Sequence, residues 1–178
     1  MLKEKLQVCI GLCNPKSPDN VNSVRRAAGN YRVDAIFHTG SRYLRALRKN
    51  PDTPNINRSV SLNIPVKGVE DLIDQVSEGM QVVCVEFAEG ATPLPSYQHP
   101  ERALYIFGPE DGNISQKIID RADAVVYVPT VGCMNLAATV NVLLYDRLTK
   151  SDQCFDNHQL ILENRDTNNN LKFKKQSV

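Results

Sequence analysis

The chain of 178 residues contains no tryptophan, and aromatic residues make up only 6% of it. So few aromatic side chains argue against a groove that stacks successive bases of a nucleic-acid strand. An excess of charge is also missing, because 21 Lys and Arg residues face 20 Asp and Glu residues, for a formal net charge of +1. Taken over the whole chain, this balance disfavours a nucleic-acid partner, since phosphate binding usually requires a basic surplus.

Long apolar segments and paired cysteines are missing as well. No stretch approaches the roughly 20 apolar residues of a membrane span, and no apolar segment of signal-peptide length follows the charged residues 1–6. The five cysteines form no Cys-x-x-Cys pair and the three histidines are far apart, so no spacing indicates a metal site. We therefore expect a cytoplasmic protein without a membrane partner or a metal, with buried free thiols at Cys9, Cys84 and Cys133.

What the sequence does contain is typical of an α/β protein. β-branched apolar runs bounded by turn residues predict strands at 7–12, 33–38, 59–62, 81–85, 103–107 and 124–128. Helical patterns lie between them, at 20–30 with Asp19 or Asn20 as the N-cap, and at 43–48, 69–76, 116–120 and 136–148, the last with apolar residues on most sides. This alternation predicts a mainly parallel sheet flanked by helices.

The character of the chain changes after about residue 149. We expect one domain over residues 1–150 and a partly flexible C-terminal extension over residues 151–178. The extension is rich in asparagine at 164–170 and basic at 172–175. Two interpretations stay open for it, a solvated tail and an arm that becomes ordered on RNA.

The loops that follow the predicted strands are the places to look for a ligand site, because parallel sheets bind ligands at the carboxyl ends of their strands. The relevant loops are 13–20, 87–93, 108–112 and 129–135. None of them contains a dinucleotide fingerprint, a phosphate-binding loop or a nucleophile turn. The residues alone leave an α/β protein whose candidate polar groups include Arg26, Glu110 and Asn135.

Three sequence blocks resemble the SpoU/TrmH branch of the SPOUT superfamily. Residues 20–28 place an Arg, Arg26, six positions after Asn20. Residues 104–115 contain an apolar strand and a Gly-x-Glu turn with Gly108 and Glu110, and residues 126–146 contain Val-Tyr-Val-Pro and Met-Asn-Leu sequences around Asn135. Members of this branch are knotted, S-adenosylmethionine-dependent RNA ribose methyltransferases, and the resemblance spans about residues 7–148.

The resemblance implies a C-terminal deep trefoil knot over about residues 81–148, a homodimer, and an RNA substrate methylated on a ribose 2′-hydroxyl. The lack of an appended RNA-binding domain favours tRNA over rRNA. The implied S-adenosylmethionine pocket contains Glu86, Phe87, Gly108, Val128, Cys133, Asn135 and Leu136. Cys133 stands where the family usually has a serine, so a non-catalytic RNA-binding relative stays open as an alternative.

The resemblance also implies catalytic roles for Arg26, Asn20, Glu110 and Asn135. A guanidinium group is protonated under ordinary conditions, so we expect Arg26 to fix a phosphate and stabilise a developing alkoxide rather than to act as a base. Purely local roles are the alternative. Arg26 can be a surface charge, Glu110 a carboxylate at a helix N-terminus, and the two asparagines N-caps.

The near-zero net charge conceals a strong separation of charge along the chain. Residues 1–60 carry a net charge of +7, residues 61–130 carry −7, and residues 131–178 carry +1. The basic third contains a strip of cations at helical spacing, formed by Arg42, Arg45, Arg48 and Lys49. Such a strip is either a solvated helix face or an RNA-binding surface that contacts phosphates, and we predict the latter.

Overall fold

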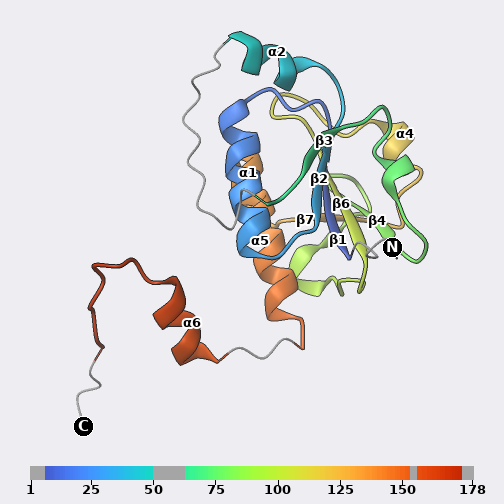
Figure 1. Ribbon diagram of the computed structural model, residues 1–178. Helices are drawn as coiled ribbons and strands as arrows, with labels where there is room; N and C mark the ends of the chain where they lie inside the picture. Colours follow the sequence, from blue (N-terminus) through green and yellow to red (C-terminus); the bar gives the residue numbers. More distant parts are fainter. Residues whose placement is uncertain (1–6, 50–62, 153–155, 174–178) are drawn as a thin grey trace.

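One parallel sheet of seven strands organises the protein (Figure 1). The computed structural model describes residues 7–49, 63–152 and 156–173, so the strand predicted at 59–62 lies outside the described residues. The strand order is β3-β2-β1-β6-β4-β7-β5, and every pairing is parallel. The strands are β1 (Val8–Leu12), β2 (Ala35–His38), β3 (Val66–Gly68), β4 (Gln81–Val85), β5 (Thr92–Pro93), β6 (Ala103–Phe107) and β7 (Ala124–Tyr127). The predicted mainly parallel α/β fold is confirmed.

Helices cover both faces of this sheet. On one face lie α1 (Pro18–Asn30) and α5 (Leu136–Thr149), side by side in Figure 1, and on the other lie α4 (Gln116–Ile119) and the 3-10 turn η1 (Ile73–Gln75). The remaining helical elements are α2 (Arg42–Lys49), the 3-10 turn η2 (Leu94–Ser96) and α6 (Asn157–Asn164). No helix within the described segments is both long and apolar enough to cross a bilayer.

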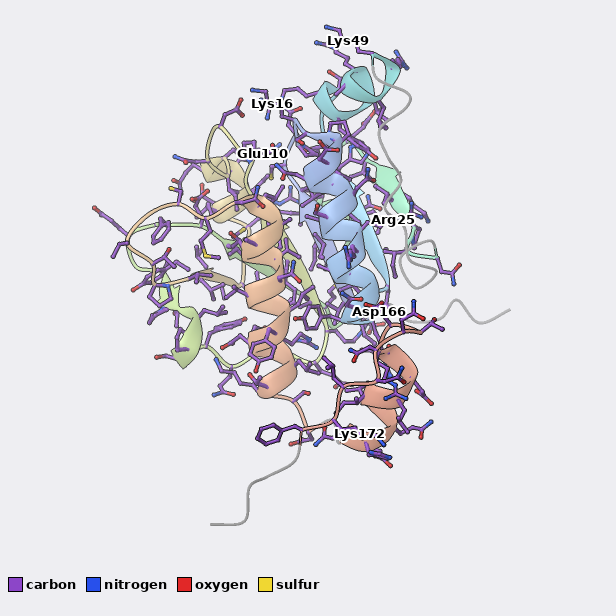
Figure 2. The ribbon with its side chains drawn as sticks, turned by 90° about the vertical axis from the view of Figure 1, so that its left-hand side faces the viewer. Lys16, Arg25, Lys49, Glu110, Asp166 and Lys172 are labelled. Atoms are coloured by element: carbon purple, nitrogen blue, oxygen red, sulfur yellow. The ribbon has the colours of Figure 1, made fainter. Side chains whose placement is uncertain are left out.

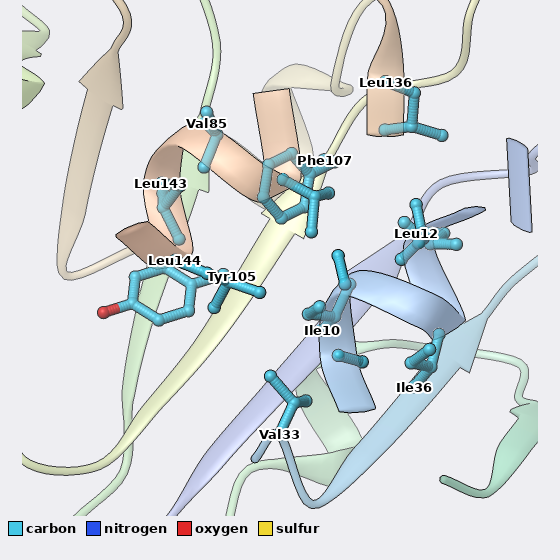
Figure 3. Close-up of a cluster of buried hydrophobic side chains, with 14 of the residues drawn as sticks. Ile10, Leu12, Val33, Ile36, Val85, Tyr105, Phe107, Leu136, Leu143 and Leu144 are labelled. Carbon is cyan, nitrogen blue, oxygen red and sulfur yellow. The ribbon is translucent and has the colours of Figure 1, made fainter. Parts of the chain in front are cut away.

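The central strand β6 shows how the two cores are built. All five of its residues are buried, as expected for a strand covered on both faces. Tyr105 and Phe107 face α1 and α5, where they join Ile10 and Leu143 in the cluster of Figure 3. Leu104, of opposite parity, joins the core beneath α4. Burying each such side chain stabilises the fold by roughly 1.5–3 kcal/mol.

The start of α1 differs from the prediction. Ser17 is the N-cap, because its Oγ accepts a hydrogen bond from the Asn20 backbone N–H at 3.3 Å. Pro18 follows at the first helical position, where its missing N–H costs nothing. The prediction of Asp19 or Asn20 as the cap is therefore wrong, and the Asn20 side chain is left available for another contact.

The prediction of a helix at 69–76 is also wrong. Only η1 forms there, because the Asp71 carboxylate accepts the Ile73 N–H at 2.8 Å and closes a local turn that competes with a helix. Val69, Ile73 and Val76 still pack against the sheet. The apolar pattern thus marked the correct buried face in a segment of a different backbone conformation.

Two other features were not expected from the sequence. The helix α5 is less buried than predicted, since Val142 is 36% exposed and Tyr145 is 60% exposed. The extension contains the regular helix α6, which begins at the N-cap Asp156 and has no buried residue. Figure 1 shows α6 beyond the C-terminal end of α5.

A buried polar network ties the end of α5 to the sheet. His99, whose side chain is 4% exposed, places Nδ1 2.7 Å from the Tyr105 hydroxyl and Nε2 2.9 Å from Asp146 Oδ2. Lys150 Nζ donates to the same Asp146 oxygen at 2.7 Å. Burial lowers the pKa of His99, and it outweighs the opposing effect of the Asp146 carboxylate.

We expect this network to make stability depend on pH. The folded state keeps His99 neutral, whereas the unfolded chain protonates it near its ordinary pKa of 6.5. The stabilisation is therefore complete above pH 6.5 and is lost as the pH falls toward the folded-state pKa. Denaturant unfolding between pH 7.5 and 5.5 should show this loss in the wild type and a flatter profile in His99→Gln. Burial also lowers the pKa of His38, but the wild type and His99→Gln both contain this residue, so it contributes equally to their pH profiles. Identical pH slopes would contradict the prediction.

Candidate functional site

A cavity of about 160 Å³ lies at the carboxyl ends of β4, β6 and β7. The last residues of these strands, Val85, Phe107 and Tyr127, line it, and the first turn of α5 contributes Leu136 and Thr139. The cavity thus occupies the edge of the sheet at which parallel α/β proteins bind ligands.

Most residues predicted to bind the cofactor line this cavity. They are Glu86, Phe87, Gly108, Val128, Cys133 and Leu136. Asn135 is not among the lining residues, because its carboxamide caps α5 instead: Oδ1 accepts the N–H groups of Ala137 and Ala138 at 2.9 and 3.3 Å. The cavity also has walls that the sequence did not single out, namely Pro109, Asn113, Thr130, Met134 and Thr139.

Glu86 connects two loops of the cavity wall. One carboxylate oxygen accepts the N–H of Phe87 at 3.0 Å, and the other accepts the N–H of Ile114 at 3.0 Å. Gly108 makes this arrangement possible, because an added Cβ would lie 3.2 Å from Glu86 Oε2 and 3.3 Å from the Ile114 nitrogen. The Glu86 carboxylate therefore links the loop after β4 to the segment at Ile114 within the cavity wall.

Three polar side chains that are distant in sequence meet at the rim of the cavity. Glu110 accepts hydrogen bonds from Asn20 Nδ2 at 3.1 Å and from the N–H groups of Lys16 and Ser17 at 2.9 and 3.1 Å. Asn135 Nδ2 in turn donates to Asn20 Oδ1 at 3.0 Å. The start of α1, the loop after β6 and the start of α5 are thereby joined in one network.

This network fixes the charge of Glu110. Burial alone would raise the pKa of its carboxyl group, but the hydrogen bonds from Asn20 and from two backbone N–H groups hold the pKa below its usual value. Glu110 is therefore an anion at neutral pH. This anion lines the cavity together with apolar side chains, and Arg42 Nη2 lies 4.0 Å from its Oε2.

Comparison with known proteins identifies the fold. The model of the SpoU rRNA Methylase family matches residues 7–145, which is well over half of the chain. The chain belongs to this family of RNA methyltransferases. The predicted resemblance to the SpoU/TrmH branch is therefore confirmed.

Solved structures of other SpoU-type proteins share the fold. The A. aeolicus TrmH/SpoU tRNA modifying enzyme has a TM-score of 0.64 and 15% sequence identity, over 83% of this chain and 77% of that one. A structure described for the 2-OH methylation of C/U34 on tRNA has a TM-score of 0.66 and 18% sequence identity, over 84% of this chain and 93% of that one. The SpoU methyltransferase AviRb from Streptomyces viridochromogenes, in complex with AdoMet, has a TM-score of 0.65 and 17% sequence identity, over 84% of this chain and 60% of that one. No curated protein matches the chain in sequence.

Arg26 lies apart from the other predicted catalytic residues of this SpoU chain. Its side chain is exposed on α1, makes no hydrogen bond or ion pair with another described residue, and is absent from the cavity lining. Its neighbour Arg25 is held differently, by donating to the Ile64 carbonyl at 3.0 Å. A single copy of the chain therefore brings together Asn20, Glu110 and Asn135 but leaves Arg26 facing solvent.

Two other predicted residues of the SpoU chain have unexpected surroundings. Cys133 is exposed, so the prediction of a buried thiol is wrong. It lines the cavity from the loop between β7 and α5 rather than lying in a packed strand. Arg42, predicted to bind RNA, is engaged within the chain by Asp111 and the Asn14 carbonyl, whereas Arg45, Arg48 and Lys49 are exposed.

Proposed function

We propose that this SpoU protein is an S-adenosylmethionine-dependent methyltransferase that acts on a ribose 2′-hydroxyl of RNA, with tRNA favoured over rRNA, in the cytoplasm. The convergence of Asn20, Glu110 and Asn135 carries the proposal. These side chains belong to neither apolar core, and they meet at the rim of a cavity at the carboxyl edge of the sheet. The resemblance of all three blocks to the ribose-methylating branch supports the choice of the ribose hydroxyl.

The residues of the cavity fit the proposed cofactor. Apolar side chains such as Val128 and Leu136 suit an adenine ring, and the anion of Glu110 suits a positive sulfonium. When bound, S-adenosylmethionine supplies a methyl group on a positively charged sulfur. Glu86 keeps the wall of the cavity closed through its two backbone hydrogen bonds. AviRb, which shares the fold, was solved with AdoMet bound.

The chain itself must orient the attacking hydroxyl, and correct alignment of reacting atoms can contribute several kcal/mol. In this proposal the Arg26 guanidinium contacts the phosphate beside the target ribose and stabilises the oxygen as its proton passes to solvent water. Asn135 and Asn20 orient Glu110 and the start of α5. The knot over residues 81–148, which the resemblance implies, belongs to the same proposal.

A homodimer would account for the position of Arg26. Arg26, Val142 and Tyr145 are exposed on the layer formed by α1 and α5. Pairing two copies through this layer would cover the apolar side chains and bring Arg26 of one copy toward the cavity of the other. We include this pairing in the proposed function.

The proposal is tested by binding and transfer assays on the purified protein. We expect calorimetric titration with S-adenosylmethionine to show one site per chain, and labelled cofactor to methylate total tRNA at a 2′-O position. Absence of cofactor binding would overturn the proposal.

The non-catalytic alternative is favoured by one observation, the exposed Cys133 at the cavity where the family usually has serine. If the wild type binds cofactor and RNA without transfer while Cys133→Ser transfers the methyl group, the alternative is correct.

A further inference from the structure

The helix α2 is joined to the rim of the cavity by Arg42, while Tyr43 of the same helix packs against the core and edge-on to the His38 ring. Arg42 Nη1 donates to both carboxylate oxygens of Asp111 at 2.8 and 3.0 Å. Its Nε and Nη2 donate to the Asn14 carbonyl at 3.0 and 2.7 Å. Asp111 directly follows Glu110 in the loop after β6, so Arg42 connects α2 to the loop that forms the cavity rim. Both partners of the ion pair are partly exposed, at 30% and 48%, so the pair contributes little free energy, but the four hydrogen bonds of Arg42 fix where α2 begins.

The loop that receives Arg42 is itself closely fitted. Asn14 has a φ of 41°, and its backbone N–H donates to Thr39 Oγ1 at 3.2 Å. Gly40, with a φ of 72°, packs against the Asn14 side chain so closely that any Cβ at this position would overlap it. The position of the Asn14 carbonyl that accepts from Arg42 is therefore well defined by its own loop.

Beyond the anchor, α2 presents unpaired cations to solvent. The side chains of Arg45, Arg48 and Lys49 are exposed and make no hydrogen bond or ion pair with another described residue. Positions 45, 48 and 49 are three and four residues apart, so the three side chains share one helix face. Lys49 is seven residues after Arg42, so this face extends only about 10.5 Å along the helix from the anchor. Lys49, Lys16 and Glu110 lie at the same end of the molecule in Figure 2.

We infer that the face formed by Arg45, Arg48 and Lys49 binds phosphates of the RNA strand next to the target ribose. We infer further that Arg42 is a positioning residue, which sets the distance from this face to the cavity and does not contact RNA. This inference rests on the proposed function, because it takes RNA as the substrate. The exposed cations match the chemistry of phosphate contacts, whereas the hydrogen-bonding groups of Arg42 are already used within the chain.

The two roles are separable by salt dependence. With a fluorescently labelled single-stranded RNA as the probe and the full-length protein, Arg45→Ala and Arg48→Ala should each weaken binding several-fold. Each should also reduce the slope of log affinity against log salt by about 0.7. In contrast, Arg42→Ala and Asp111→Asn should leave this slope unchanged. With total tRNA at saturation, these two variants should lower kcat about tenfold, because α2 no longer holds the strand in register.

Arg32→Asn is the matched control. Arg32 is an exposed arginine at the C-terminal end of α1 with a φ of 56°, a conformation that asparagine tolerates. If Arg45→Ala and Arg48→Ala behave like Arg32→Asn, the phosphate-binding face is disproved. If Arg42→Ala reduces the salt slope as much as Arg45→Ala, the positioning role is disproved.

A second measurement keeps the inference independent of catalysis. Hydrogen exchange of the α2 amides in the RNA-free protein should be faster in Arg42→Ala than in the wild type and unchanged in Arg45→Ala. Unchanged exchange in Arg42→Ala would disprove the anchor. If the wild type transfers no methyl group, the proposed function fails, while the binding and exchange results still decide the roles of α2.

Discussion

Replacing Arg26 with alanine is expected to lower methyl transfer by about 100-fold or more, while the affinity for S-adenosylmethionine stays within about twofold of the wild type. Removing one preorganised group that stabilises developing negative charge typically costs two to three orders of magnitude in rate. Cofactor affinity should not change, because Arg26 is absent from the cavity lining. Single-turnover transfer to total tRNA, combined with calorimetry, measures both quantities.

Arg25→Ala is the control for this experiment. It removes the same charge one residue earlier on α1, from a side chain held by the Ile64 carbonyl. It should cost some stability and leave transfer nearly unchanged. Equal transfer by the wild type and Arg26→Ala would exclude Arg26 from the mechanism.

Replacing Glu110 with alanine should be almost as damaging, for a different reason. The change removes the acceptor of three hydrogen bonds, from Asn20 Nδ2 and from the N–H groups of Lys16 and Ser17. The start of α1 then loses its link to the loop after β6, and Asn20 keeps only its hydrogen bond from Asn135 Nδ2. We expect transfer to fall at least about tenfold and the free energy of unfolding to fall by roughly 1–2 kcal/mol.

Glu110→Gln separates the two contributions. Glutamine keeps one acceptor oxygen but loses the negative charge, so stability should recover in part, whereas cofactor affinity should be lower than in the wild type for both variants. Denaturant unfolding and calorimetry with S-adenosylmethionine measure these effects. Wild-type stability and transfer in Glu110→Ala would show that the network is incidental to both.

The buried strands could be predicted from the sequence because burial on both faces leaves a continuous apolar pattern. The five buried residues of β6 illustrate this. The two edge strands β3 and β5 have only three and two residues, too few for any pattern to emerge. In other segments a local hydrogen bond determined the backbone conformation, as the bond to Asp71 does in preventing a helix at 69–76.

Residues of the candidate site could be predicted only where their position in the sequence determines where their side chains lie. Residues directly after β4, β6 and β7 reach the cavity because strand ends determine where they lie. The direction of the Asn135 side chain was not predictable, since a carboxamide at a helix start can cap the helix or face a ligand. The role of Arg42 depends on Asp111 and Asn14, two partners far from it in sequence that no motif indicates.

The strand order has a consequence for how the protein is made. β1 pairs with β2 on one side and with β6 on the other, and Val8 lies opposite Ala103, about 95 residues later. At a synthesis rate of about 5–20 residues per second, one edge of β1 has no partner for roughly 5–20 s after it leaves the ribosome. An open, apolar strand edge readily pairs with other chains. The middle of the sheet is thus closed late in synthesis, when β6 pairs with both β1 and β4, and the newly made N-terminal third depends on β6 for its protection.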